Sequence, residues 1–525
     1  MKRIFPYPLV LISAVILDRV AISSSQIGID QSLRALSVLL VLAAIITLMI
    51  QYFVKDWRYT NFIVLMIPVA LIAYRSLYRF LKTSFPHQAN ALGIALLVLL
   101  GVLYAVIVRR KVWKSLRNPA RVTTYFNVVF IVLLIFQLVR LAPAGYHMLT
   151  KLSQPQTTVP VLGPDFKLHK GSSSPDIYVI ILDGYARQDV LQTIYKHDNS
   201  EFIAELEKRG FYVANSSHSN YVQTVYTMSS FWNLDYLTTW EASDQYVQYL
   251  FEPIQKNRVY RALHEIGYTT VSFAGAVHYT GIKNSDVYLS NFLPLNDFES
   301  LLLVDSPIEP LSNLFDLGIP VQTYKTHRQR TLYQLDTLKE IPASIPGPKI
   351  VYAHILAPHP PFAFYQNGDI RDQQRPYTLA EGTGRQGGLQ EYWYGYQEQV
   401  KFINREILKV IDAILQKSKS PPVILLMGDH GPASMFNFDP QTPGCLWERT
   451  SILYAISLPG HENDNTVYPS ISPVNTFRVI FNTYFGTDLP LLEDRSYLMY
   501  WYDPKVKVDI TDVRDSLNGC TPPSH

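Results

Sequence analysis

Long apolar runs separated by short polar segments occupy the first 145 residues of the chain. Their bounds are 4–22, 35–54, 62–78, 91–108 and 122–141. Each run is close to the roughly 20 apolar residues with which a helix crosses the hydrocarbon core of a bilayer. Five such runs in succession, almost free of acidic residues, argue against the buried helices of a soluble core. The first run also resembles an uncleaved signal sequence, but no small-residue cleavage site follows it cleanly. The pattern predicts a transmembrane domain of five helices over residues 1–145.

Basic residues between the apolar runs are concentrated in alternate loops. These loops are residues 2–3, 55–58 and 109–121. The loop 23–32 has no basic residue, although Arg79 and Lys82 weaken the contrast at the other loop of that side. The positive-inside rule places the basic loops in the cytoplasm. After five crossings, everything beyond about Pro143 is expected outside.

After residue 175 the pattern changes to short apolar runs that alternate with helical periodicity. Residues 151–175 are rich in Pro, Ser and Thr and indicate a tether, so we place a linker at 146–175 and a second domain at 176–525. Buried strands are predicted at 176–182, 269–275, 350–356, 422–431 and 451–457, and helices at 201–209 and 396–416. This alternation predicts an α/β domain with a largely parallel central sheet.

The charge distribution separates the same two parts. The whole chain has a net charge of +3 and 17% charged residues, below the roughly 25% of soluble domains. Residues 1–149 contain 16 basic and three acidic residues, a balance of +13, so the rest carries −10. The small net charge excludes a dedicated nucleic-acid binder. Two cysteines exclude a disulfide-rich scaffold and a cysteine-rich metal site. Cys445 and Cys520 form a disulfide or stay unlinked thiols, and the sequence leaves both open.

Acidic residues and histidines follow the predicted strands. Asp183 follows the first strand, His354 lies near the end of the third, and Asp429 with His430 ends the fourth. In parallel sheets, ligands bind outside the carboxyl ends of the strands. Each residue alone is more typical of a structural turn. Together, two carboxylates and imidazoles predict a site for a divalent cation, with Mn²⁺ or Zn²⁺ favoured over Mg²⁺ or Ca²⁺.

Four motifs, in this order, resemble the alkaline phosphatase/sulfatase superfamily. They are LDG at 182–184, NYVQTVYTMSS at 220–230, HILAPHPPF at 354–362 and GDHG at 428–431. The chain is most similar to the membrane branch, the lipoteichoic acid synthases and lipid-A phosphoethanolamine transferases. Those proteins also carry about five transmembrane helices before an external catalytic domain. The architecture is similar over the whole chain, whereas the motifs are confined to the second part.

The resemblance implies a role for each motif residue. Asp183, Asp429 and His430 would hold a metal ion, and Thr224 would be a fourth ligand and the nucleophile. A threonine hydroxyl is a poor nucleophile at neutral pH, and coordination to a divalent cation lowers its pKa. Other hydroxyl groups of the same segment compete for this role: Thr227, Ser229 and Ser230.

Substrate contacts are also implied by the resemblance. His354 and His359 have the H-x-x-x-x-H spacing of the transferases, in which His359 would contact the phosphate or a second metal. His354 is equally interpreted as a structural residue at a strand end. Arg449 would meet an anionic group of the substrate or form a structural salt bridge. Asn475 and Arg478 resemble residues that hold the fold.

Several positions depart from the family pattern. Asp183 stands where the transferases usually have Glu, as in the hydrolytic branches. Gly184 stands where sulfatases have a second Asp, and neither cysteine has the Cys/Ser-x-Pro-x-Arg context of a formylglycine. These departures argue against a formylglycine arylsulfatase. Pro360 replaces a glycine that is common after the second histidine of the transferases.

The first functional hypothesis is a membrane-anchored, metal-dependent phosphotransferase. It would move a phospho-head group from a phospholipid donor to an envelope glycan or lipid through a phospho-threonine. One alternative is a phosphodiesterase, phosphatase or sulfuric-ester hydrolase of the same superfamily. Another is a catalytically silent envelope protein that mediates interactions. Several helices suit a lipid donor, because an enzyme for soluble substrates needs only one anchor. The expected location is the plasma or inner membrane, with the catalytic domain outside.

Overall fold

The computed structural model divides into two compact units. It describes residues 7–23, 29–85, 88–109, 119–153, 164–169, 174–237, 251–277, 279–293, 295, 297–315, 317–319, 323–371, 375, 377–437, 443–462, 464–499 and 507–521. The first unit, called the helical unit below, comprises Met1–Thr157, Phe292–Gln322 and Gln374–Pro376. The second, the sheet unit, comprises Thr158–Asn291, Thr323–Gln373 and Tyr377–His525. Residues 292–322 therefore interrupt the sequence of the sheet unit and belong to the helical unit.

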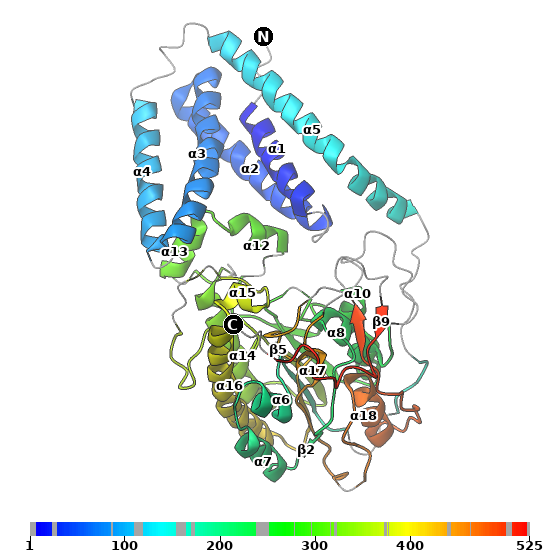
Figure 1. Ribbon diagram of the computed structural model, residues 1–525. Coiled ribbons are helices and arrows are strands. Elements are labelled where there is room, and N and C mark those ends of the chain that lie inside the picture. Colours follow the sequence, from blue (N-terminus) through cyan, green and yellow to red (C-terminus); the bar gives the residue numbers. More distant parts are fainter. Residues whose placement is uncertain are drawn as a thin grey trace. The chain divides into compact units, whose positions relative to one another are not determined.

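Each of the five apolar runs coincides with a helix of the helical unit (Figure 1). The helices are α1 (Tyr7–Ser23), α2 (Ile29–Val54), α3 (Trp57–Ser84), α4 (Ala89–Arg109) and α5 (Pro119–Ser153). Among the described residues, four helices are long and apolar enough to cross a membrane, and they are α2 to α5. Helix α1 has 17 residues. Of the five predicted crossings, four therefore correspond to candidate spans among the described residues, and the crossing of α1 stays a prediction.

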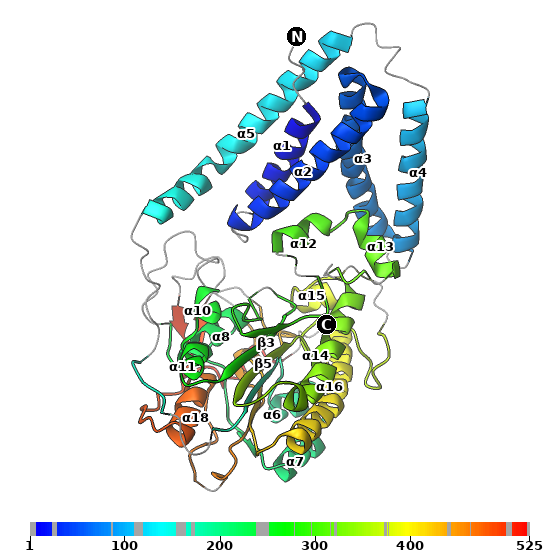
Figure 2. The same cartoon turned by 180° about the vertical axis from the view of Figure 1, so that it is seen from behind.

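Two short helices from the interrupting segment pack onto the long ones. Helix α12 (Asp297–Leu303) contacts α2, and α13 (Ile308–Phe315) contacts α4. Figure 2 shows both beside the ends of α2, α3 and α4. Buried Phe298 of α12 joins Ile16, Val20 and Ala35 in an apolar cluster.

The sheet unit is built on a mixed sheet in which most neighbouring strands are parallel. Within the described residues the strand order is β2-β7-β6-β1-β5-β3-β4. Strands β6, β1, β5, β3 and β4 run parallel, whereas β7 is antiparallel to β6 and β2 is antiparallel to β7. The bounds are β1 Ile177–Leu182, β2 Tyr212–Val213, β3 Thr269–Phe273, β4 Val287–Leu289, β5 Lys349–Ile355, β6 Val423–Met427 and β7 Tyr454–Ser457. A separate hairpin pairs β8 (Tyr497–Met499) with β9 (Lys507–Asp509).

Apolar side chains on both faces of the sheet are buried by helices. Successive residues of a strand point to opposite faces, and in β1 Ile177, Val179 and Ile181 join one core while Tyr178, Ile180 and Leu182 join another. The first core includes side chains of α8 (Thr224–Asn233), α10 (Glu252–Gln255), α11 (Arg258–Glu265) and α18 (Thr476–Tyr484). The second includes α6 (Gln188–Thr193), α7 (Ser200–Lys208), α14 (Tyr324–Ser344) and α16 (Leu389–Lys417). Figures 1 and 2 show the two groups on opposite sides of the sheet.

The five predicted strands correspond to β1, β3, β5, β6 and β7, and the two predicted helices to α7 and the larger part of α16. Strands β2 and β4 escape prediction because segments of two or three residues carry no periodic signal. Short helical turns also escape it: α15 (Thr383–Gln386), α17 (Leu446–Thr450) and η2 (Pro473–Asn475). Cys445 and Cys520, left open by the sequence, form a disulfide.

Candidate active site

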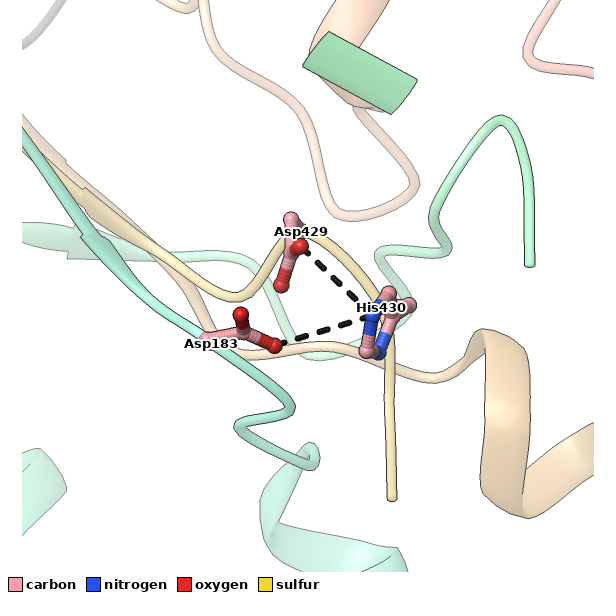
Figure 3. A group of neighbouring side chains, drawn as sticks. All are labelled: Asp183, Asp429 and His430. Atoms are coloured by element: carbon pink, nitrogen blue, oxygen red, sulfur yellow. Dashed lines mark ion pairs between the residues drawn. The ribbon is translucent and has the colours of Figure 1, made fainter. Parts of the chain in front are cut away.

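The metal-ligand candidates lie at the carboxyl ends of neighbouring parallel strands. Asp183 directly follows β1, and Asp429 and His430 come after β6, which pairs with β1. His354 lies on β5, the other neighbour of β1. Because these strands are parallel, their carboxyl ends meet at one edge of the sheet. Figure 3 shows Asp183, Asp429 and His430 pointing toward one another.

The three side chains form a buried cluster with the spacing of a metal site. His430 Nε2 lies 3.6 Å from Asp183 Oδ1 and 3.6 Å from Asp429 Oδ2. Among the described residues, neither of these two carboxylate oxygens has a hydrogen-bond donor, although both are buried. Ligand atoms about 2.0–2.2 Å from a tetrahedral ion are separated by about 3.4 Å. The geometry and the unsatisfied carboxylate oxygens therefore fit a divalent cation between these three residues.

Backbone contacts orient the cluster. His430 Nδ1 lies 2.9 Å from the carbonyl oxygen of Gly431, so the N–H is assigned to Nδ1 and the lone pair of Nε2 faces the carboxylates. The backbone N–H of Gly184 donates to Asp429 Oδ1 at 3.2 Å. Gly184 has φ +72°, a conformation that glycine adopts without strain. A Cβ on Gly431 would lie 2.0 Å from the carbonyl oxygen of Glu448, so only glycine permits this turn to approach α17.

Thr224, the predicted nucleophile, is the first residue of α8, and its side chain is directed at the cluster. Its Oγ1 lies 3.1 Å from His430 Nε2. Two of the competing hydroxyls are held elsewhere: Thr227 donates to the carbonyl of Tyr221 at 3.0 Å, and Ser230 to that of Asp235 at 2.7 Å. The positive end of the helix dipole favours negative charge at a helix N-terminus. Oγ1 of Thr224 is thus placed beside the cluster, at the positive end of the helix dipole.

His354 supports Asp183 from the neighbouring strand. Its Nε2 lies 3.1 Å from Asp183 Oδ2, and its Nδ1 lies 3.1 Å from the hydroxyl of Tyr352. Although burial opposes protonation, the hydrogen bond to Asp183 and the charges of both carboxylates raise the pKa of His354. Burial likewise opposes ionisation of Asp183, but the imidazoles of His359 and His354 hold its pKa well below the usual range. Asp183 is therefore an ionised carboxylate, as a metal ligand must be.

His359 and Arg449 meet at a residue that sequence reasoning missed, Glu381. Glu381 Oε1 lies 3.5 Å from His359 Nε2 and 2.7 Å from Arg449 Nη1. Arg449 also donates to the carbonyl oxygens of Val222, at 2.8 Å, and Gly431, at 2.9 Å. Burial opposes ionisation of Glu381, but the charges of Arg449 and His359 lower the pKa of its carboxyl group. Arg449 thus connects the segment before Thr224 to the turn that carries His430.

Glu381 gives no signal in the sequence because it lies in a glycine-rich loop far along the chain from its partners. Glu381 lies far beyond the end of β5, in the irregular segment between that strand and the four-residue helix α15. The structure thus brings together all seven predicted site residues: Asp183, Thr224, His354, His359, Asp429, His430 and Arg449. Arg449 belongs to this group through its ion pair with Glu381.

No sequence family model matches the chain, and no curated protein matches it. Solved structures that are similar to it include the C-terminal periplasmic domain of EcEptC from Escherichia coli in complex with Zn. The two sequences are 12% identical, and the match covers 67% of this chain and 97% of that one with a TM-score of 0.45. Another is the integral membrane protein lipooligosaccharide phosphoethanolamine transferase A from Neisseria meningitidis, with 11% identity over 91% of this chain and 95% of that one, and a TM-score of 0.39. A third is the phosphonate monoester hydrolase of Agrobacterium radiobacter. It is 12% identical over 63% of this chain and 82% of that one, with a TM-score of 0.38.

Proposed function

We propose that this protein is a membrane-anchored phosphotransferase that uses Thr224 as its nucleophile. One observation carries the proposal: Thr224 Oγ1 lies 3.1 Å from Nε2 of His430, which itself lies 3.6 Å from a buried oxygen of Asp183. A hydroxyl beside a cluster of carboxylates and an imidazole is the arrangement that metal-assisted group transfer requires.

Asp183, Asp429 and His430 would hold the divalent ion, with Thr224 as the fourth ligand. Such an ion would lower the pKa of the Thr224 hydroxyl and neutralise charge on the phosphoryl oxygens. The Nδ1–H bond from His430 to Gly431 keeps the imidazole in the orientation that a ligand needs. His359, buried beside Glu381, would donate a hydrogen bond to a phosphoryl oxygen.

Two displacements at phosphorus complete the reaction. In the first, Thr224 Oγ1 forms a bond to phosphorus while the bond from phosphorus to the diacylglycerol oxygen breaks, and the proton of the hydroxyl passes to that departing oxygen. In the second, the oxygen of an acceptor hydroxyl forms a bond to phosphorus while the bond from phosphorus to Thr224 Oγ1 breaks, and the proton of the acceptor passes to Oγ1. The donor would be a phospholipid such as phosphatidylglycerol or phosphatidylethanolamine, and the acceptor an envelope glycan or lipid.

A lipid donor accounts for the size of the helical unit. Helices α2 to α5 are each long and apolar enough to cross a bilayer, whereas a single anchor suffices for an enzyme with soluble substrates. Several helices can instead accommodate a lipid whose head group must reach an external active site. This reasoning favours a phospholipid over a soluble phosphodiester as donor.

Trapping of the intermediate tests the proposal. The full-length protein is incubated with head-group-labelled phospholipid and Mn²⁺ or Zn²⁺, and the label on the chain is located by peptide mapping. We expect a metal-dependent adduct on Thr224 that is absent in Thr224→Ala. Ser230→Ala is the matched control, because it removes a hydroxyl of the same helix whose hydrogen bond is to Asp235.

A labelled adduct that survives in Thr224→Ala, or no adduct and no head-group release by metal-loaded protein, would contradict the proposal. The acceptor is then tested separately. Label that appears on an added glycan or lipid identifies a transferase, and free phospho-head group alone identifies a hydrolase. Asp183 stands where the transferases usually have Glu, and this feature favours a hydrolase.

A further inference from the structure

The polarity of helix α13 is reversed relative to a helix on a water-exposed surface. Its buried residues include Glu309 and Ser312, which are 3% and 6% exposed. Its exposed residues include Leu314 and Phe315, at 59% and 63%, and Leu317, just beyond the helix, is 47% exposed. Acidic residues are almost never fully buried unless paired, and a surface helix normally turns its polar side chains outward. This pattern indicates that the outer face of α13 is in contact with something apolar.

The buried acids of this segment are paired with bases of helix α3. Asp305 accepts hydrogen bonds from Arg79 Nη2 at 2.8 Å and Lys82 Nζ at 3.1 Å. Glu309 Oε1 accepts one from Lys82 Nζ at 2.7 Å. Its other oxygen, Oε2, accepts from the backbone N–H of Asp305 at 2.7 Å. These pairs fix α13 against the carboxyl-terminal end of a membrane-spanning helix.

Two further contacts hold the segment at the same helix ends. Asn313 Nδ2 donates to Oδ1 of Asn90, one residue into α4, and the hydroxyl of Tyr78 donates to the same oxygen at 3.1 Å. Arg34, near the beginning of α2, pairs with Glu299 of α12. The segment therefore lies where three spanning helices leave the hydrocarbon core.

The exposed apolar surface of α13 belongs to the same unit as the lipid-facing surface of α3. Phe80 and Leu77, next to the paired bases of α3, are 62% and 47% exposed. Side chains of this kind on a spanning helix are covered by lipid. The ion pairs place Leu314 and Phe315 close to this level of the bilayer.

We propose that α13 and Leu317 form an interfacial membrane anchor, with Leu314, Phe315 and Leu317 inserted among the lipids of the external leaflet. The occupant of this surface is the bilayer, because the polar side of α13 is satisfied by α3 and α4 and its apolar side continues theirs. An interfacial helix of this kind lies in the plane of the head groups with its apolar face in the acyl boundary. The sheet unit is thereby linked to the membrane by the segment 292–322 as well as by α5. This anchor is independent of the proposed catalytic function.

Quenching by brominated lipid tests the anchor. Phe315→Trp is prepared in the full-length protein and placed in lipid nanodiscs with or without bromine on the acyl chains near the head groups. Emission of the wild type, which has its own tryptophans, is subtracted. We expect the added emission to be blue-shifted and mostly lost in the brominated nanodiscs. Phe80→Trp, at an exposed position of α3 beside the paired bases, is the positive control and should be quenched in the same way.

Added emission from Phe315→Trp that is quenched by aqueous iodide and untouched by brominated lipid would overturn the proposal. So would emission that neither agent quenches, which indicates a protein partner or a second copy of the chain. Leu314→Trp is made in parallel, so that failure of one variant to fold leaves the test intact. Neither substitution involves a residue of the candidate active site, so the result does not depend on activity.

Discussion

Thr224 Oγ1 and His430 Nε2 lie 3.1 Å apart, although their residues are 206 positions apart in the chain. The contact joins the first turn of α8 to the turn that follows β6. Because the Nδ1–H of His430 is engaged by Gly431, the lone pair of Nε2 can accept the Thr224 hydroxyl proton or bind a cation, but not both. Metal binding therefore replaces the hydrogen bond between these two residues.

Metal should stabilise the wild-type protein through Asp429. Asp429→Asn removes a charge from the cluster, so we expect it to lose most of the stabilisation. At a free ion concentration one hundred times the Kd, binding to the folded state alone adds about 2.7 kcal/mol. Thermal unfolding in Mn²⁺ or Zn²⁺ and in chelator measures the difference.

Thr224→Val keeps the three other ligands and should retain a substantial part of the metal response. An equal response in wild type and Asp429→Asn would refute this site.

Glu381→Gln should destabilise the sheet unit strongly. The substitution leaves the guanidinium of Arg449, which is 1% exposed, without its carboxylate. Removing one partner of a buried ion pair typically costs about 3–5 kcal/mol. Denaturant unfolding measures the loss. Glu493→Gln is the matched control, because its carboxylate pairs with Arg495 and both side chains are exposed, at 69% and 43%, and such pairs contribute about 1 kcal/mol or less.

The double variant Glu381→Gln/Arg449→Met separates charge from packing. It removes both charges at once, so we expect it to be more stable than Glu381→Gln alone. A double variant no more stable than the single one would show that the ion pair is not the source of the loss.

Stability should fall on acidification through His327 of α14. This side chain is 1% exposed, and burial, together with the charges of Arg330 and His359, lowers its pKa to about 3. In the unfolded chain a histidine has a pKa of about 6.5. Below pH 6.5 the unfolded state therefore binds a proton that the folded state does not, and stability decreases as pH falls.

Urea unfolding at pH 6 and pH 5 checks this prediction. Over this interval His327 accounts for a loss of about 1 kcal/mol in the wild type, which His327→Gln should lack. His169→Gln, at an exposed position, should keep the wild-type pH dependence. If the two variants respond alike, His327 is not the group responsible.

The strand-end residues could be predicted because parallel strands end at one edge of a sheet. Asp183, His354 and Asp429 each follow or end an apolar run, so one topological rule brings them together. Thr224 was identified only by its motif, since nothing in the local pattern directs the first residue of α8 toward β6. Glu381 could not be predicted, because a loop residue without periodicity is positioned by tertiary contacts alone.

The interrupting segment was missed for a related reason. Residues 292–322 lie in the sequence of the sheet unit, and the acids Glu299, Asp305 and Glu309 resemble an ordinary solvated loop. Their partners are Arg34, Arg79 and Lys82, more than 200 residues earlier. Arg79 and Lys82 weaken the charge contrast on which the orientation was predicted. Pairing with acids of the sheet-unit sequence would explain how these bases are tolerated in a loop that is predicted to be external.

These pairs lead to a prediction for the first helix. Arg34 lies near the amino-terminal end of α2 and Lys82 near the carboxyl-terminal end of α3, and both meet acids from the segment 292–322. We therefore expect those two helix ends, and with them the carboxyl-terminal end of α1, on the external side of the membrane, where the sheet unit is predicted. If α1 crosses, the N-terminus is cytoplasmic, in agreement with Lys2 and Arg3. A green fluorescent protein fused to the N-terminus should then fluoresce, whereas a C-terminal fusion exported in the unfolded state should stay dark. A dark N-terminal fusion on a full-length, membrane-inserted chain would show that α1 does not cross and that the protein has four spans.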